Sequence, residues 1–404
     1  MKPHLSASPS DSLLPDEMLL LIRERPSGLT IGIPAETRLF ETRLALTPEA
    51  VALLAKQGHR VVVGAGAGAS LQYPDTAYAE AGAVVTESAA EVWSADVVMK
   101  VSIPTAQEIR LMRPRAVLFS LVQLRLFKSD LLRLLLEKRI TAIGYDFIAD
   151  LRGERPLINQ IRELEGRTAV VVASSLLTNS HGGKGILMGG CAGVSPTEVV
   201  ILGAGHAGSE AARTAQAMGA LVKVFDDDIE RLRSVQLSLG PATFTSTFHP
   251  NVLSNALRSA DVVIGAMRLE QCHHRYYLPS DMIRLMKRGA LILDMSLDQG
   301  GCFETSVFPE TEAETRFEQF GVTHYCLPNI SSLVGRTATI AMSNHILPMI
   351  KTLADAGSIE TALRENLPLR KGVYTYAGRV VNTMVADWFG VAGSDIMLFL
   401  TSLQ

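Results

Sequence analysis

A glycine-rich run in the middle of the chain has the residue spacing that binds a dinucleotide. The run is Gly203-Ala204-Gly205-His206-Ala207-Gly208, and it lies between a predicted strand, 198–202, and a predicted helix, 210–217. In this motif the first glycine makes a tight turn, the second lets the backbone approach a pyrophosphate, and the third allows close packing of helix and strand. The phosphates lie at the helix N-terminus, which favours anions. We therefore expect Gly203, Gly205, His206, Ala207 and Gly208 to line the cofactor site, with His206 exposed in the first helical turn.

A carboxylate follows the next predicted strand at the distance that this motif requires. Asp226 stands 23 positions after Gly203, directly behind the predicted strand 221–225. A carboxylate there binds the ribose 2′-hydroxyl of NAD, and the acidic run 226–228 would repel the 2′-phosphate of NADP. The sequence therefore predicts NAD as the cofactor. A second glycine-rich run, 64–69, also follows a strand, but Tyr73-Pro74-Asp75 would break the required helix, so we interpret it as a turn.

The composition argues against several other classes of protein. The 404 residues contain 38 Lys and Arg against 41 Asp and Glu, a net charge of −3, so no basic face is expected for nucleic acid. No unbroken apolar run reaches the roughly 18 residues that a membrane span needs. The four cysteines are far apart and form no CxxC pair, which fits neither a zinc site nor a disulfide framework. We expect no nucleic-acid or membrane partner, no metal, reduced thiols and a cytoplasmic location.

The elements that must position the cofactor motif alternate between strands and helices. Such alternation predicts an α/β fold with doubly wound parallel sheets, covered by helices on both faces. The predicted helices are 47–57, which begins with Thr-Pro-Glu, 163–177, 345–356 and 371–389. Short β-branched runs predict strands at 29–33, 60–63, 96–101, 116–121 and 140–145, and then at 198–202, 221–225, 261–265, 290–294 and 322–326.

Two series of strands and helices indicate two domains. Residues 1–28, rich in serine and proline, are interpreted as an N-terminal extension. The first domain is expected to comprise 29–155 and, because the C-terminal helices would pack back on it, also 343–404. The dinucleotide motif lies in the second domain, 156–342, which would then be inserted into the first.

Further motifs, spread over about nine-tenths of the chain, resemble those of the alanine dehydrogenase family, which shares its fold with the NAD(H)-binding subunit of proton-translocating transhydrogenase. The resemblance implies two Rossmann-like domains with the active site in the cleft between them. It also implies reversible oxidative deamination of an L-amino acid, nominally L-alanine, to a 2-oxo acid such as pyruvate and ammonia, and a homo-oligomer, a hexamer or a dimer. The motifs are Gly32-Ile33-Pro34-Ala35-Glu36, Arg43-Leu44-Ala45-Leu46-Thr47-Pro48, Val98-Met99-Lys100-Val101, Gly182-Gly183-Lys184-Gly185, Leu297-Asp298-Gln299-Gly300-Gly301-Cys302-Phe303-Glu304-Thr305, and Pro328-Asn329-Ile330 with Arg336-Thr337-Ala338-Thr339.

The resemblance also implies roles for single residues. Arg43 and Lys100 would contact the substrate carboxylate and carbonyl: a guanidinium grips a carboxylate with two parallel hydrogen bonds, and an ammonium polarises a carbonyl. Asn329 would line the cleft, and Asp298 would lie at the ligand-binding edge of the second sheet, near both cofactor and substrate. The cofactor's ribose and nicotinamide would be bordered by Ala266, Met267 and Arg268.

The chain departs from the family pattern at three places. Gln123 stands where the family has a catalytic histidine, and an amide can hydrogen-bond a carbonyl but cannot exchange a proton near neutral pH. Arg162 stands where a small serine is usual, close to the nicotinamide, so it would crowd the ring or bind an acidic group of the substrate. Leu269-Glu270-Gln271 replaces a Pro-Gly turn.

Three functions are compatible with these departures. In a working dehydrogenase, Arg43 and a positive nicotinamide would lower the pKa of Lys100, which could then act as the base, assisted by Asp298 or a water. In an imine reductase of the saccharopine or opine kind, Arg162 would bind an extra substrate carboxylate. The third is an NAD(H)-binding protein without catalysis. Because Arg43, Lys100 and Asp298 occur together, the sequence favours the dehydrogenase.

Overall fold

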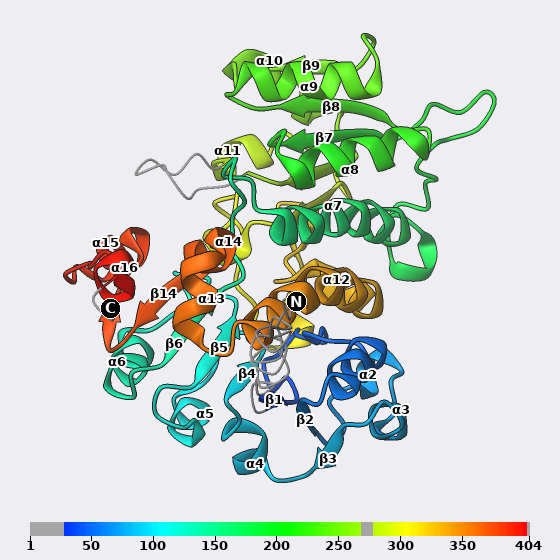
Figure 1. Ribbon diagram of the computed structural model, residues 1–404. Coiled ribbons are helices and arrows are strands. Elements are labelled where there is room, and N and C mark those ends of the chain that lie inside the picture. The colour runs from blue at the N-terminus through cyan, green and yellow to red at the C-terminus, as the bar shows by residue number, and fades with distance from the viewer. Residues whose placement is uncertain (1–27, 268–277, 402–404) are drawn as a thin grey trace, which may run out of the picture.

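The strands of the protein form two separate sheets, each made mostly of parallel strands (Figure 1). The computed structural model describes residues 28–267 and 278–401. Nearly all of the predicted N-terminal extension therefore lies outside the described residues. Among those described, no helix is both long and apolar enough to cross a membrane.

The first sheet has eight strands in the order β15-β14-β6-β5-β4-β1-β2-β3. Its first six strands in sequence are parallel and follow the 3-2-1-4-5-6 order of a Rossmann fold, while β14 runs antiparallel to β6. The strands are β1 (Thr30–Ile33), β2 (Arg60–Gly64), β3 (Val84–Thr86), β4 (Val97–Met99), β5 (Val117–Ser120), β6 (Thr141–Gly144), β14 (Val373–Tyr376) and β15 (Arg379–Val380).

The second sheet has seven strands in the order β12-β13-β11-β10-β7-β8-β9. It repeats the same Rossmann order, extended by the antiparallel strand β12. The doubly wound α/β fold predicted from the sequence is thereby confirmed for both halves. The strands are β7 (Glu198–Leu202), β8 (Leu221–Phe225), β9 (Phe244–Ser246), β10 (Val262–Gly265), β11 (Leu291–Asp294), β12 (Arg316–Gln319) and β13 (Val322–Tyr325).

In each sheet the strand order reverses at one point, and ligands of open α/β sheets bind beyond the carboxyl ends of the strands there. In the first sheet this point lies between β1 and β4, and the segments that follow these strands carry Arg43 and Lys100. In the second sheet it lies between β7 and β10, which precede the glycine-rich run and Ala266. The topology alone therefore directs both predicted half-sites to sheet edges suited for ligand binding.

Helices cover the sheets, and the two longest, α7 and α12, lie between the two sheets in Figure 1. Helix α7 packs against α8, α12 and the short 3₁₀ helix η5 (Ile330–Val334). The α-helices are α2 (Pro48–Lys56), α3 (Asp75–Glu80), α4 (Ala89–Trp93), α5 (Ala106–Leu111), α6 (Ser129–Glu137), α7 (Pro156–Leu176), α8 (His206–Ala217), α9 (Ile229–Leu239), α10 (Pro250–Ser259), α11 (Ser280–Ile283), α12 (Gly335–Asp355), α13 (Ile359–Glu365), α14 (Leu367–Gly372), α15 (Thr383–Phe389) and α16 (Ile396–Thr401).

The local signals explain most of these elements. Helix α2 begins as predicted, because the Thr47 side chain accepts a hydrogen bond from the Ala50 N–H and Pro48 occupies the first turn. The second glycine-rich run forms turns and a 3₁₀ helix, η1 (Ala69–Leu71), and α3 begins only after Pro74. In this run the Gly66 N–H donates to the Asp75 carboxylate at 2.9 Å. This loop N–H, which could otherwise bind a phosphate, is therefore used by an acid of the chain.

The predicted helix over 371–389 is wrong. Residues 373–376 instead form the buried strand β14, which pairs with β6, and Gly378, at φ +83°, turns the chain into β15. The helix starts only at Thr383, capped by Asn382. The run Val-Tyr-Thr-Tyr is β-branched and aromatic, a composition that packs well between sheet neighbours, and a short apolar run does not by itself distinguish strand from helix.

Candidate active site

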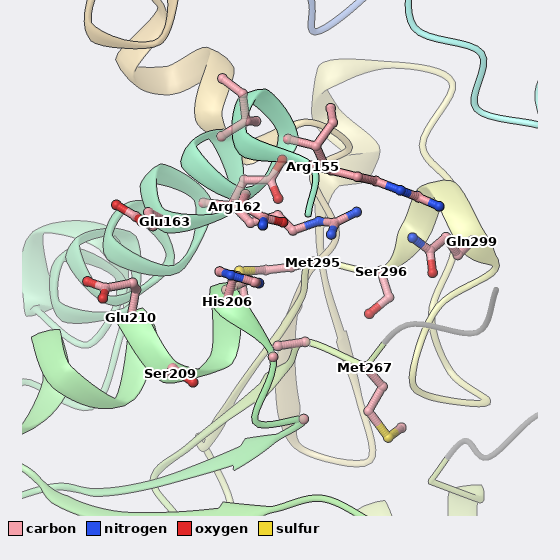
Figure 2. Close-up of a pocket in the computed structure, with 18 of the residues that line it drawn as sticks. Arg155, Arg162, Glu163, His206, Ser209, Glu210, Met267, Met295, Ser296 and Gln299 are labelled. Carbon is pink, nitrogen blue, oxygen red and sulfur yellow. The ribbon is translucent and has the colours of Figure 1, made fainter. Parts of the chain in front are cut away.

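A cavity of about 970 Å³ is lined by residues of α7 and of the segments that follow strands of both sheets. The first half of the cavity follows strands of the first sheet and includes Arg43 and Gln123. The second half follows strands of the second sheet and includes the glycine-rich loop and Asp226. Figure 2 shows Arg155, directly before α7, and Arg162, on α7, reaching across this cavity toward the segment that carries Ser296 and Gln299. The structure thus brings most of the sequence-predicted residues to one place.

The three glycines of the loop have the distinct roles that the motif predicts. Gly203 has φ +106°, and a Cβ there would lie 2.7 Å from the Ala266 carbonyl oxygen. A Cβ at Gly208 would overlap the carbonyl oxygen of Gly203, so only glycine lets helix and strand pack this closely. A Cβ at Gly205 would meet nothing within 4 Å, so this glycine faces open space. The loop therefore has room for a pyrophosphate where the motif would bind one.

The acidic end of β8 lies beside this loop. Asp226 is 8% exposed; its Oδ2 accepts the Ala204 N–H at 2.6 Å, and its Oδ1 accepts the Asp228 N–H at 2.8 Å. Burial and the nearby Asp226 raise the pKa of Asp227. Because the carboxylate of Asp226 is fixed by main-chain donors at the cavity wall, it is suited to accept a hydrogen bond from a ribose hydroxyl.

The other predicted cofactor residues border the same space. His206 is the first residue of α8 and is exposed, as expected, and Ala207, Ala266 and Met267 also line the cavity. Arg268 and the Leu269-Glu270-Gln271 departure lie outside the described residues. Asp298 lies in the 3₁₀ helix η3 (Leu297–Gln299) behind β11, and it also lines a second cavity of about 520 Å³.

Arg43 is a buried cation held by one carboxylate. Its Nε and Nη2 donate to Glu41 at 2.7 and 2.6 Å, and its Nη1 donates to Ser331 Oγ at 3.1 Å. Burial lowers the pKa of Arg43, but Glu41, with Glu165 and Glu36, raises it above its ordinary value, so the guanidinium stays charged. Three of the five N–H donors are used in these bonds, which leaves one on each terminal nitrogen for a substrate carboxylate.

Lys100 has acidic neighbours. Its side chain is 1% exposed, and Nζ lies 3.2 Å from both Glu36 and Glu108. Burial raises the pKa of Glu36, and Lys100 opposes this rise. From the sequence we expect a positive charge beside Lys100 that would favour its basic form. The structure instead places two carboxylates, Glu36 and Glu108, beside its Nζ. Lys100 is also not among the residues that line the large cavity.

Gln123 belongs to a chain of amide hydrogen bonds that leads to Arg43. Its Nε2 donates to Asn329 Oδ1 at 3.3 Å, and Asn329 Nδ2 donates to Glu41 Oε2 at 3.5 Å. Both Gln123 and Asn329 have positive φ, +41° and +55°. Position 123, where the sequence resemblance implied a histidine, therefore holds a fixed amide, which can orient a ligand but offers no exchangeable charge.

Sequence reasoning missed three residues of the substrate half. Glu41 holds Arg43, Ser331 joins it from η5, and Glu165 on α7 lines the cavity one turn after Arg162. Burial raises the pKa of Glu165 to about 7, against the opposing effects of Arg43 and a hydrogen bond with Ser331. The available signal was the spacing of Arg162 and Glu165, three apart and thus on one face of a helix.

Fold and cavity together define a two-sheet protein of the dinucleotide-binding α/β class. Comparison with known proteins gives the family. The models of the alanine dehydrogenase/PNT N-terminal and C-terminal domains match residues 32–163 and 169–383. An alanine dehydrogenase of Mycolicibacterium smegmatis is 37% identical over 375 residues, 92% of this chain and 100% of that protein, and one of Mycobacterium tuberculosis is 36% identical over 364 residues, 90% and 97%.

Solved structures agree. A structure of L-alanine dehydrogenase matches with a TM-score of 0.83 at 34% identity and covers 90% of this chain and 99% of that chain. A transhydrogenase from Sinorhizobium meliloti, at 24% identity and a TM-score of 0.73, covers 87% and 99% and shares the fold. The chain belongs to the alanine dehydrogenase/PNT family, which confirms the resemblance inferred from its motifs and implies a nicotinamide dinucleotide cofactor.

Proposed function

We propose that this protein is an NAD-dependent L-alanine dehydrogenase, which interconverts L-alanine with pyruvate and ammonia. The observation that carries this proposal is that one cavity is lined both by the glycine-rich loop and by Arg43. It is supported by the names of the relatives, alanine dehydrogenases at 34–37% identity over about nine-tenths of the chain.

In this proposal the second half of the protein holds the cofactor. Gly203, Gly205 and Gly208 shape the loop for the pyrophosphate, and Asp226 accepts a hydrogen bond from the adenosine ribose. The acidic run 226–228 favours NAD over NADP, because it would repel a 2′-phosphate. Ala266 and Met267 border the nicotinamide side. When bound, NAD supplies the chemistry of hydride transfer.

The first half holds the substrate. The two remaining N–H donors of Arg43 grip the substrate carboxylate, and the amides of Gln123 and Asn329 orient its carbonyl or amino group. Arg162 closes the side toward the nicotinamide. For Lys100 we propose a supporting role: its positive charge offsets part of the negative charge of Glu36 and Glu108 and so keeps the site receptive to an anion.

The proton is assigned to Asp298. The reaction needs a group that takes a proton from the substrate ammonium or from water, and the Gln123 amide cannot do this near neutral pH. Asp298 is an ionisable side chain that lines both cavities beside Asn329. Its position after β11, at the ligand-binding edge of the second sheet, is where such a group can reach a substrate bound between the halves.

We also propose the domain division expected from the sequence, with 29–155 and 343–404 forming the substrate domain and 156–342 the cofactor domain. Its main support is that β14 and β15, near the C-terminus, are strands of the first sheet. The site would then lie between two domains, and the chain would pass from one domain to the other twice.

The function is tested by an NADH oxidation screen over 2-oxo acids, with ammonium and with alkylamines as nitrogen donors. We expect pyruvate with ammonium to give the highest kcat/KM. Turnover with amines alone would favour an imine reductase instead. Micromolar NADH binding without turnover of any pair would favour a binding protein and contradict the proposal.

A further inference from the structure

Glu165 is an acid on the wall of the cavity to which the proposed reaction assigns no role. It lies on α7, and its side chain lines the same cavity as Arg43. Ser331 lies near both residues: Arg43 Nη1 donates to Ser331 Oγ at 3.1 Å, and η5, which carries Ser331, packs against α7, which carries Glu165. Glu165 is therefore close to the guanidinium that would bind the substrate carboxylate.

The two buried cations of this region are already paired with carboxylates before Glu165 is counted. Arg43 is bound by Glu41, and Lys100 is bound by Glu36 and Glu108. An ionised Glu165 would add one more negative charge at the place where the substrate brings its own. Two carboxylates in a poorly hydrated site repel each other strongly, and a single proton relieves that repulsion.

We propose that Glu165 controls substrate binding by taking up one proton: its neutral carboxyl admits the substrate carboxylate to Arg43, and its ionised form excludes it. The ligand class is thus a monocarboxylate bound together with a proton. This inference rests on the proposed function, because it takes Arg43 as the carboxylate anchor. The neutral carboxyl can also donate a hydrogen bond to a substrate oxygen, which the carboxylate cannot do.

The surroundings set the proton equilibrium of Glu165 near neutral pH. Burial raises its pKa to about 7, and Glu41 adds to this rise, whereas Arg43 and the Ser331 hydrogen bond oppose it. Arg162, Glu163 and Arg167 are its charged neighbours in sequence on α7. The charged or titratable groups of the helices packed against α7 are His206, Glu210 and Arg213 on α8, where Glu210 pairs with Arg167 and Arg213, and Arg336, His345, Lys351 and Asp355 on α12, where Arg336 donates to the carbonyls of Leu71 and Gln72.

The direction of the pH effect follows from linkage. A bound carboxylate favours the neutral form of Glu165, so binding raises the pKa of Glu165 further and takes up a proton. The affinity for substrate is therefore highest below about pH 7 and falls by up to about tenfold for each pH unit above it. At saturating substrate the carboxyl is already neutral, so kcat does not share this dependence.

The test compares the wild type with Glu165→Gln, which is neutral at every pH and nearly the same size. KM for pyruvate is measured from pH 6 to 9 at saturating NADH and ammonium. For the wild type we expect log KM to rise above pH 7 with a slope approaching one. For Glu165→Gln we expect a flat KM close to the wild-type value at pH 6, with kcat at pH 6 within about twofold.

Two further variants sharpen the comparison. Ser331→Ala removes a hydrogen bond that favours the ionised form of Glu165, so the rise in KM should begin at higher pH. Glu163→Gln is the matched control: Glu163 lies on the same helix, 43% exposed, with Arg167 at 3.8 Å. It should keep the wild-type pH dependence of KM.

Three kinetic results would overturn the inference. One is an unchanged pH dependence of KM in Glu165→Gln. Another is a loss of kcat at every pH in that variant, which would assign the proton of the chemical step to Glu165. In the third, the wild type binds substrates with a cationic side chain more tightly at high pH, and Glu165→Gln does not. Glu165 would then act as an ionised partner of the substrate.

A binding measurement separates this inference from the proposed reaction. Calorimetry of oxamate binding to the protein–NADH complex at pH 7.5, in buffers of different ionisation enthalpy, measures proton uptake directly. We expect a substantial fraction of one proton for the wild type and none for Glu165→Gln. Proton uptake without pyruvate turnover would leave the inference standing and the proposed function refuted. Pyruvate turnover without proton uptake would overturn the inference alone, and no oxamate binding even at pH 6 would overturn both.

Discussion

The cofactor half and the substrate half of the cavity are built from different kinds of interaction. The cofactor half relies on backbone shape: three glycines within six positions, and one carboxylate fixed by main-chain N–H groups. The substrate half relies on buried side-chain charges, in which Arg43 and Lys100 are each held by carboxylates. The difference teaches that the half with the glycine-rich loop is specified by the shape of its backbone, and that the half with Arg43 is specified by the charge and hydrogen-bond geometry of its side chains.

Replacing the planar guanidinium of Arg43 should have the largest effect on activity. Arg43→Lys keeps the charge but loses the planar geometry that holds Glu41 and a substrate carboxylate together. We expect kcat/KM for pyruvate to fall on the order of a hundredfold or more, with NADH affinity unchanged, because misplaced substrate reacts poorly. Steady-state kinetics and NADH fluorescence titration measure the two quantities.

The control for this prediction is Arg60→Lys, at an exposed pair with Glu91, which should leave both quantities unchanged. Weaker NADH binding together with unimpaired pyruvate kinetics in Arg43→Lys would contradict the division into two halves.

A change of shape in the cofactor half should come next. Gly205→Val places a side chain in open space, so the free protein should keep its Tm while its Kd for NADH rises on the order of thirtyfold. Gly208→Val instead meets the Gly203 carbonyl and should prevent stable folding. An unchanged Kd in a folded Gly205→Val variant would mean that the cofactor does not approach this loop.

The half-buried Glu165 on the cavity wall should affect the stability of the protein in one pH range. The pKa of Glu165 is about 7 in the folded protein and near 4.5 in the unfolded chain, so the folded state binds more protons between these values. Its contribution is therefore favourable below pH 4.5 and is lost as the pH rises through 7. The unfolding free energy of Glu165→Gln minus that of the wild type should therefore increase by about 2 kcal/mol from pH 5 to pH 8. Urea titrations of both proteins at pH 5 and pH 8 measure this change. The same difference in unfolding free energy at both pH values would refute the prediction.

Restoring an ionisable ring at position 123 should have the smallest effect. Gln123→His returns an acid–base group to a position that hydrogen-bonds Asn329, so kcat for alanine oxidation should rise about tenfold. Initial rates at pH 8 to 10 with saturating NAD give the answer. A fall in kcat would show that the amide is itself adapted to the reaction.

The sequence predicted the two halves unequally well, for a physical reason. The glycine motif is local: turn, close packing and helix N-terminus are specified within a few residues, and the sheet order follows from alternating strands and helices. The ion network is not local, because Arg43 and Ser331 meet across 288 positions and Glu165 joins them from a third element. The acids that surround Lys100 and Arg43 could not be placed from spacing, and the strand 373–376 was misread because its apolar run is too short to show a period.

The central claim, that both halves act in one reaction, is tested most directly by following the nitrogen atom. The protein is incubated with NADH, pyruvate and ¹⁵N-ammonium, and the products are analysed by NMR and by NADH absorbance. The account predicts ¹⁵N-labelled L-alanine, with one molecule formed for each NADH oxidised. Binding of NADH without any labelled amino acid, or NADH oxidation without transfer of the label, would contradict it.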